Sequence, residues 1–376
     1  MNSYVDNFSK RLEVVNSNYK KDMFQSYLTA IEWRNVEMAE EYAMHLKEGN
    51  KFYNFPYFRQ LIEFYKIFGN SYIAARNYNS HFDIMMSGHM LMNIFILSSV
   101  TMEYALKGLF SIPLSLLSLF GNSNKTDLQE KVAEIFNEYE KFIHHTPFYK
   151  FPYFAKIIPI WKSFLHSENK SITDIVMLFS ITLEFIVRGM LSFPADYMSN
   201  SILDSAPEVT NIIVEMESEN NEQLEEEFKL KVKGISDKLC LKLNIAEINL
   251  QEQIFIRQEG EKKILYANLV LPRYEEFKQV IDELIQNNIK LKKIAGQDNV
   301  QVRFSLEAKD ETDLKVRMNN LSQNVPQTSQ ILYSYTNSID RNKIMMALNL
   351  NMDKFNETIK DLNSKDGFNL KLVHDF

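Results

Sequence analysis

The stretch Phe52–Phe58 reads Phe-Tyr-Asn-Phe-Pro-Tyr-Phe, and it returns 96 positions later as Phe-Tyr-Lys-Phe-Pro-Tyr-Phe in Phe148–Phe154. After each copy, apolar residues recur with the spacing of one helix face. Each proline suits the first position of a helix, because its missing N–H has no intrahelical partner to lose there. We therefore predict an aromatic hinge that begins a helix in each of two copies of one helical unit.

A second pair of matched segments follows the hinges. Residues 101–113 and 182–194 share Thr, Glu, a cation four residues after the Glu, Gly and Pro, at an offset of 81. The surrounding runs, 90–112 and 172–193, are apolar nearly all round, which is typical of a helix at the centre of a bundle or in lipid. We interpret the run Met90–Leu119 as a buried helix that breaks at Pro113, with membrane insertion as the alternative.

The two matches define a first domain. We predict that residues 1–204 form an all-α domain from a duplicated helical unit, with copies at about 20–120 and 125–200. The offsets differ by 15 residues (96 − 81), and we assign this extra length to a loop within Asn70–His89. Gly69 and Asn70 would end the preceding helix.

The chain changes character after residue 204. Glutamates crowd the stretch 205–227, which we interpret as a solvated acidic linker. From Phe228 the apolar residues alternate, and Leu239–Ile245, around the single cysteine Cys240, has the pattern of a strand. A thiol with no second cysteine forms no disulfide within the chain.

The remaining sequence repeats one pattern of strand, helix and strand. The predicted sets are 264–271 with 274–286 and 289–294, then 300–308 with 311–321 and 331–335, then 344–350 with 353–362 and 368–373. Single helices between short strands indicate a layered sheet with helices on one face. We therefore predict an α+β protein whose residues 228–376 form a mixed α/β domain of repeated β-α-β, ferredoxin-like phrases.

Composition limits the classes of function. The chain has 376 residues, a net charge of −7 and only ten glycines, and it matches no standard phosphate-binding, nucleophile or metal-ligand motif. We accordingly expect no cofactor, no metal and no nucleic-acid partner, because phosphate binding needs concentrated Lys and Arg. The first 15 residues lack the apolar segment of a signal peptide, so we expect a cytoplasmic protein.

The best candidate site is a charge pair that occurs in both apolar helices. Glu103 precedes Lys107 by four residues, and Glu184 precedes Arg188 in the same way, which is the favoured orientation of an intrahelical ion pair. Three interpretations remain open: a buried pair that fixes helix register, a polar spot in a cavity for a lipid or other amphipathic ligand, and a catalytic carboxylate.

The aromatic hinges supply the other candidate binding residues. These are Tyr53, Tyr57, Phe58, Tyr149, Tyr153 and Phe154. They could form core packing around the proline, or a protein or membrane interface at an exposed turn, where amphipathic rings are favoured.

Together these features favour a non-enzymatic structural or adaptor protein that acts through protein–protein contacts or self-association. The first alternative is a lipid-binding or peripheral membrane-docking protein that uses the apolar helices. The second is an enzyme with an unrecognised site.

Overall fold

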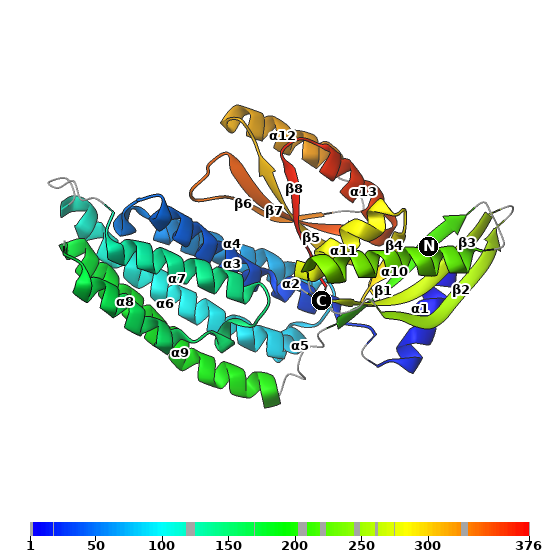
Figure 1. Cartoon of the computed structure of the whole chain (residues 1–376), viewed down its shortest axis with the longest axis horizontal. Helices are drawn as coiled ribbons and strands as arrows, with labels where there is room; N and C mark the ends of the chain where they lie inside the picture. The colour runs from blue at the N-terminus through cyan, green and yellow to red at the C-terminus, as the bar shows by residue number, and fades with distance from the viewer. Residues whose placement is uncertain are drawn as a thin grey trace. The chain divides into compact units, whose positions relative to one another are not determined.

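The computed structural model shows a mixed α+β protein that divides into two compact units (Figure 1). The structure describes residues 3–17, 19–117, 125–168, 170–201, 209–218, 223–243, 249–259, 262–273, 275–324 and 330–375. We call residues 27–206 with 337–341 the helical unit. Residues 1–26, 207–336 and 342–376 form the sheet unit.

The helical unit contains two successive sets of elements. The first set is α3 (Ala30–Lys47), η1 (Phe52–Asn54), α4 (Tyr57–Arg76), α5 (His81–Met85) and α6 (Gly88–Leu117); the second is α7 (Asp127–Ile143), η3 (Phe148–Lys150), α8 (Tyr153–His166) and α9 (Ile172–Ser201). A short helix, α2 (Met23–Leu28), precedes them. Both sets therefore run in the order helix, 3₁₀ turn, helix and long apolar helix, with α5 present in the first set only.

The two aromatic hinges have the same backbone conformation. Phe55 and Phe151 are extended, with φ/ψ of −71/137° and −69/136°, as expected for residues before proline. Pro56 and Pro152 also agree, at −82/62° and −80/62°. Each proline caps its helix from one residue outside it, so the helices begin at the following tyrosine rather than at the proline.

The helices form two layers. Contacts connect α4 to α6, α6 to α9 and α9 to α8, which gives a layer in the order α4-α6-α9-α8. The paired helices α3 and α7 form the second layer, and they contact members of the first. We call the side of the four-helix layer that meets α3 and α7 its inner face, and the opposite side its outer face.

The sheet unit contains two four-stranded antiparallel sheets. The first comes from β1 (Val209–Ser218), α10 (Leu224–Leu243), β2 (Asn249–Glu259), β3 (Lys262–Pro272), α11 (Glu275–Gln286) and β4 (Lys290–Ile294), in the strand order β2-β3-β1-β4. The second comes from β5 (Asn299–Glu307), α12 (Glu311–Asn324), β6 (Gln330–Thr336), β7 (Lys343–Asn351), α13 (Met352–Ser364) and β8 (Phe368–Val373), in the order β6-β7-β5-β8. Both have the element order β-α-β-β-α-β. The three predicted β-α-β phrases coincide with β3-α11-β4, β5-α12-β6 and β7-α13-β8.

Helix α1 (Ser3–Val15) belongs to the sheet unit, although we predicted it as part of the helical domain. Its Val5 and Leu12 pack with Ile213 of β1 and Tyr266 of β3. The sequence pattern identified the apolar face of this helix, but an apolar face does not specify which partner buries it.

The acidic linker predicted for residues 205–227 was wrong over its centre and its last residues, because Val209–Ser218 is the strand β1 and α10 begins at Leu224. Strand β1 lies between β3 and β4, and its apolar residues Ile212, Ile213, Val214 and Met216 are buried. The buried Glu215 lies within 3.7 Å of Lys290 and 3.5 Å of Lys292 on β4. The glutamate that suggested a solvated linker is thus neutralised by the neighbouring strand. The remaining residues of that stretch, 205–208 and 219–222, lie outside the described residues.

The strands predicted from Phe228 through Leu243 form the helix α10 instead, and Cys240 lies on it. Its buried residues are Leu224, Phe228, Val232, Ile235 and Leu239. They are three or four residues apart, which is the spacing of one helix face. Leu230 and Leu241, which suggested strand alternation, are exposed. Residues 244 and 245 lie outside the described residues.

Two predicted helix ends were also wrong. Helix α4 continues past Gly69 and Asn70 to Arg76, and α6 continues through Pro113 to Leu117. Helix α9 likewise contains Pro194. A proline removes one backbone hydrogen bond, and a helix that is packed along its length tolerates that loss.

Candidate functional site

The structure brings the four charged candidates together on the inner face of the four-helix layer. Glu103 and Lys107 come from α6, and Glu184 and Arg188 come from α9. None is more than 6% exposed. The 30-residue helices place these side chains opposite one another because α6 and α9 pack side by side. We call these four residues the ion tetrad.

The ion pairs of the tetrad connect the two helices. Lys107 pairs with Glu184, and Arg188 lies 2.6 Å from Glu103 and 3.1 Å from Glu184. The Glu184–Arg188 pair within α9 is the one that the sequence predicts. For α6, the prediction of a pair within the helix was wrong, since Lys107 reaches across to Glu184. Two carboxylates and two cations balance the formal charge of the site.

Tyrosines complete the surroundings of both cations. The Lys107 ammonium lies 4.5 Å from the ring centroid of Tyr42, and the Arg188 guanidinium lies 4.8 Å from that of Tyr139. Arg188 also donates a 2.7 Å hydrogen bond to the Tyr139 hydroxyl, which accepts a second from Asn35 at 3.1 Å. Rings and hydroxyls thereby replace part of the hydration that burial removes.

Burial shifts the protonation equilibria of the tetrad. It raises the pKa of Glu103 to about 7, with the neighbouring Arg188 acting in the opposite direction. It also lowers the pKa of Lys107, against the attraction of Glu184. Perturbed pKa values occur at catalytic sites and in structural ion-pair networks alike. Because all four side chains are buried, solvent reaches this site only if the surrounding helices move.

The hinge candidates separate into inner and outer residues. Tyr57 and Tyr153 are buried, and each hydroxyl donates a 2.9 Å hydrogen bond to the backbone carbonyl of the phenylalanine five residues earlier. Tyr53 and Tyr149 are partly buried on the 3₁₀ turns. Of the two interpretations of the hinges, core packing therefore fits Tyr57 and Tyr153.

Phe58 and Phe154 lie on the outer side, each 44% exposed. The ring of Phe58 covers Gly108 and the ring of Phe154 covers Gly189, so closely that a Cβ would lie 2.7 Å and 2.6 Å from ring atoms. The glycine after each cation therefore accommodates an aromatic ring from the neighbouring helix. Nothing in the sequence alone connected these residues, which are 50 and 35 positions apart.

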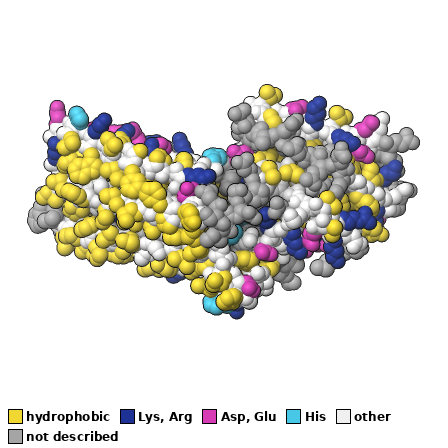
Figure 2. All heavy atoms as spheres, turned by 90° about the horizontal axis from the view of Figure 1, so that it is seen from below, with side chains coloured by type: hydrophobic (Ala, Val, Ile, Leu, Met, Phe, Trp, Pro, Cys, Tyr) yellow, Lys and Arg dark blue, Asp and Glu magenta, His cyan; other side chains and the backbone are white. Residues whose placement is uncertain are grey.

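The outer face of the four-helix layer is apolar. Its exposed large residues are Phe58, Ile62, Tyr65 and Ile73 of α4; Ile94, Met102, Leu109, Ile112 and Leu116 of α6; Phe154, Ile158 and Leu165 of α8; and Ile172, Ile175, Phe179, Leu183, Ile186, Met190, Phe193 and Tyr197 of α9. Figure 2 shows hydrophobic side chains gathered densely over the helical unit. By length and composition α6 and α9 could each cross a membrane, and only 44% of each apolar window is buried within the protein.

The helical unit contains a second buried charge cluster that no sequence pattern reveals. Arg34 of α3 is fully buried and lies 2.8 Å from Glu41, and it also bonds Gln60 of α4. Ser338, in the short segment 337–341 of the helical unit, donates its backbone N–H to Glu41 at 3.1 Å. A glutamate on a helix ordinarily faces solvent, but Glu41 does not. It is buried because Arg34, two turns earlier, supplies its partner.

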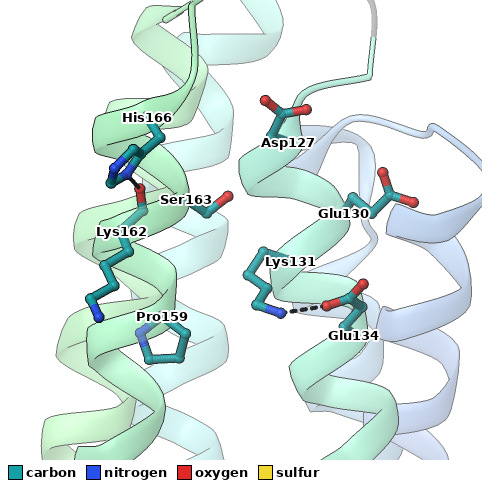
Figure 3. Close-up of a pocket in the computed structure, with 8 residues that line it drawn as sticks. All are labelled: Asp127, Glu130, Lys131, Glu134, Pro159, Lys162, Ser163 and His166. Carbon is teal, nitrogen blue, oxygen red and sulfur yellow. Dashed lines mark hydrogen bonds and ion pairs between the residues drawn. The ribbon is translucent and has the colours of Figure 1, made fainter.

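An open pocket of about 490 Å³ lies between α7 and α8 (Figure 3). Charged side chains dominate its lining, but Lys131 pairs with Glu134, and His166 bonds the Lys162 carbonyl. Among the described residues, no three His, Cys, Asp or Glu side chains are arranged to hold a metal ion. The pocket is a solvated groove between surface residues.

Comparisons with known proteins add little. No family model matches the chain, and no curated protein matches it. One solved structure, described as an unknown protein from Galdieria sulphuraria, covers 45% of this chain and 99% of its own, with 10% identity and a TM-score of 0.17. A similarity this weak supports no argument about fold or function.

Proposed function

We propose that this protein is a non-enzymatic, peripheral membrane-docking protein that binds a lipid bilayer through the outer face of its four-helix layer. One observation carries the proposal: α3 and α7 cover only the inner face, whereas the outer face is apolar along four helices. Helix α9 alone presents eight large apolar side chains along 30 residues, or about 45 Å of helix.

The size of this surface supports an apolar partner. The largest apolar patch on a typical monomer is roughly 300–600 Å², and it is often functional. Burial of one large apolar side chain contributes about 1.5–3 kcal/mol. Even half of that contribution from each of the eight side chains on α9 amounts to roughly 10 kcal/mol. Covering this surface with an apolar partner is therefore strongly favourable in free energy.

The position of the charges supports lipid as that partner. Ionisable residues on membrane-embedded helices face the protein interior and pair with one another, as the ion tetrad does on α6 and α9. We propose a structural role for the tetrad, which holds these two helices in register, and no direct role in ligand binding.

We further propose that the helical unit consists of two copies of one ancestral unit. Three matched contacts support this. Phe58 on Gly108 corresponds to Phe154 on Gly189. The 2.7 Å hydrogen bond of Tyr65 with Thr101 corresponds to the 3.0 Å bond of Trp161 with Thr182, and Tyr57 with Phe52 corresponds to Tyr153 with Phe148.

Similarly, we propose that the sheet unit consists of tandem ferredoxin-like folds, on the basis of its two β-α-β-β-α-β orders with equivalent strand arrangements. The proposed location is cytoplasmic, at the inner surface of a membrane.

A second candidate is the adaptor function, in which a protein helix covers the same face. The exposed apolar residues of α9 recur at intervals of three and four, from Ile172 to Tyr197. That spacing also suits a coiled-coil partner. A second copy of this chain or a different protein could supply such a helix.

Flotation of the full chain with lipid vesicles tests the proposal. Wild-type protein should float, and Phe179→Glu with Met190→Glu should reduce vesicle binding by at least about 100-fold, because two charges replace two inserted apolar groups. Both residues are more than half exposed, so folding should be retained. Met44→Glu, an exposed apolar residue on α3 in the opposite layer, is the matched control and should bind normally. Wild-type protein that forms dimers or larger complexes and ignores vesicles contradicts the membrane proposal and favours the adaptor.

A further inference from the structure

We infer that the bilayer bound by the outer face is anionic, and that Lys66 of α4 and Lys162 of α8 contact the lipid headgroups at the two edges of the layer. The inference rests on the proposed function. It adds the charge of the lipid and the residues that recognise it.

The two lysines occupy matched positions, 96 residues apart, which is the offset of the aromatic hinges. Both are exposed. Lys66 follows the outer-face residue Ile62 by four positions, and Lys162 follows Ile158 by four. Residues four apart lie near one another on a helix surface, so each lysine borders the apolar stripe of its helix.

The contacts of the phenylalanines determine on which side of the stripe each lysine lies. Phe58 faces α6, because its ring covers Gly108, and Phe154 faces α9 through Gly189. Successive residues of a helix are 100° apart, so residues four positions apart are offset by 40° in the same direction. Going around each helix, the phenylalanine, the isoleucine and the lysine therefore follow in that order. Because the phenylalanine faces the neighbouring helix, the lysine lies on the side away from the centre of the layer. Figure 3 shows the Lys162 side chain pointing away from the acidic residues of α7. Each lysine therefore lies at an outer edge of the apolar face.

Charged residues are distributed unevenly between the two layers of the helical unit, with an excess of basic residues on α4 and α8 and of acidic residues on α3 and α7. Helices α4 and α8 carry five Lys and Arg residues against one Glu. Helices α3 and α7, in the opposite layer, carry nine Asp and Glu residues against four Lys and Arg. The whole chain has a net charge of −7, so the positive edges are not a consequence of overall composition. An anionic surface therefore attracts the edges formed by α4 and α8 and repels the layer of α3 and α7.

The same polarity disfavours a second copy as the occupant. A two-fold dimer through the outer face would bring the edges α4 and α8 of one copy against the same edges of the other. Like charges would then lie near one another around the whole interface, which weakens association. A bilayer accepts the apolar centre in its acyl region. The long lysine side chains can extend from the edges to the headgroups.

The experiment compares vesicles of phosphatidylcholine alone with vesicles that contain about one-third phosphatidylserine. Each lysine near an anionic surface should contribute roughly fivefold in affinity. Wild-type protein should therefore prefer the anionic vesicles at least tenfold, and Lys66→Gln with Lys162→Gln should reduce binding to them by about 25-fold. The double variant should bind neutral vesicles as wild type does.

Lys47→Gln with Lys141→Gln is the matched control, because it removes two exposed lysines from the opposite layer, one each from α3 and α7. It should leave binding unchanged. Equal binding of the wild-type protein to neutral and anionic vesicles overturns the inference. So does an equal loss of vesicle binding in the two double variants. Both outcomes leave the proposed membrane docking intact. Failure to bind either vesicle would instead count against the proposed function itself.

Discussion

The four-helix layer has charged residues on its inner face and apolar residues on its outer face, whereas most water-soluble proteins show the opposite distribution. The inner face contains Glu103, Lys107, Glu184 and Arg188, which are buried and paired. The outer face presents mainly phenylalanine, isoleucine, leucine and methionine. Charged residues are seldom fully buried, and large exposed apolar surfaces usually mark an interaction site.

Helices α6 and α9 thus carry charged residues on their buried side and large apolar residues on their exposed side, which is the reverse of an ordinary surface helix. Helices α6 and α9 are apolar nearly all round, so a hydrophobic pattern alone cannot separate their two sides. The charges instead identify the inner side, because only that side supplies partners for them. The outer side then requires a partner from outside the helical unit.

The largest effect should come from breaking the ion tetrad. Arg188→Met leaves Glu103 without its 2.6 Å partner in a buried site, which should lower the free energy of unfolding by about 3–5 kcal/mol. Chemical denaturation measures this. Replacing all four residues together, Glu103→Leu, Lys107→Met, Glu184→Leu and Arg188→Met, should restore most of the stability, because no unpaired charge remains.

The fourfold variant also separates the two faces. Its outer face is unchanged, so vesicle binding should stay at the wild-type level. If binding is lost while the fold and the stability are retained, the tetrad has a functional role and the separation of the two faces is wrong.

A smaller effect should appear as a dependence on pH. Burial raises the pKa of Glu103 to about 7 from 4.5, so the folded protein keeps a proton that the unfolded chain releases. The resulting stability is present below pH 4.5 and is lost as the pH rises through 7. At ~1.4 kcal/mol per pKa unit, the loss is up to about 3 kcal/mol.

The variant Glu103→Gln isolates this contribution. Because glutamine does not titrate, the stability of the variant relative to wild type should increase by up to about 3 kcal/mol between pH 4.5 and pH 8. Denaturation curves across that range measure it. A difference that stays constant with pH would show that Glu103 titrates normally despite its burial.

The smallest effect should come from the contact between neighbouring helices. Gly108→Ala places a Cβ 2.7 Å from the Phe58 ring, and the ring must move, at a cost of about 1–3 kcal/mol. Gly69→Ala on α4 is the matched control, since nothing lies within 4 Å of its Cβ position. It should stabilise the protein by up to about 1 kcal/mol through helix propensity. Thermal unfolding distinguishes the two, and equal shifts in the same direction would contradict the close packing of Phe58.

Much of the architecture could be predicted from local patterns. The apolar helices 90–112 and 172–193 and the three β-α-β phrases coincide with elements of the structure. These segments have strong periodicity, which depends only on neighbouring residues. The predictions failed at β1 and α10, where Glu215 and alternating leucines suggested a linker and strands. The lysines that neutralise Glu215 come from β4, which is adjacent in the sheet but far away in the sequence. No local pattern reveals such a partner.

The candidate site divides in the same way. The repeated spacing of Glu and a cation identified all four members of the tetrad from the sequence. The partners of Lys107 and Arg188 could not be predicted, because the distance between α6 and α9 determines which carboxylate each cation reaches. Arg34 and Glu41 were missed for a related reason, since charges seven residues apart resemble an ordinary solvent-exposed helix face.

The motif Phe-Tyr-x-Phe-Pro-Tyr-Phe occurs twice, and its residues are sufficient to predict that a helix begins there each time, because proline restricts the backbone locally. Which of its rings enter the core depends instead on the tertiary structure. Tyr57 and Tyr153 point inward, and Phe58 and Phe154 cover the glycines of the next helix and border the outer face. Side-chain burial depends on the packing of whole helices, and that packing also leaves one face of the layer uncovered by the helical unit.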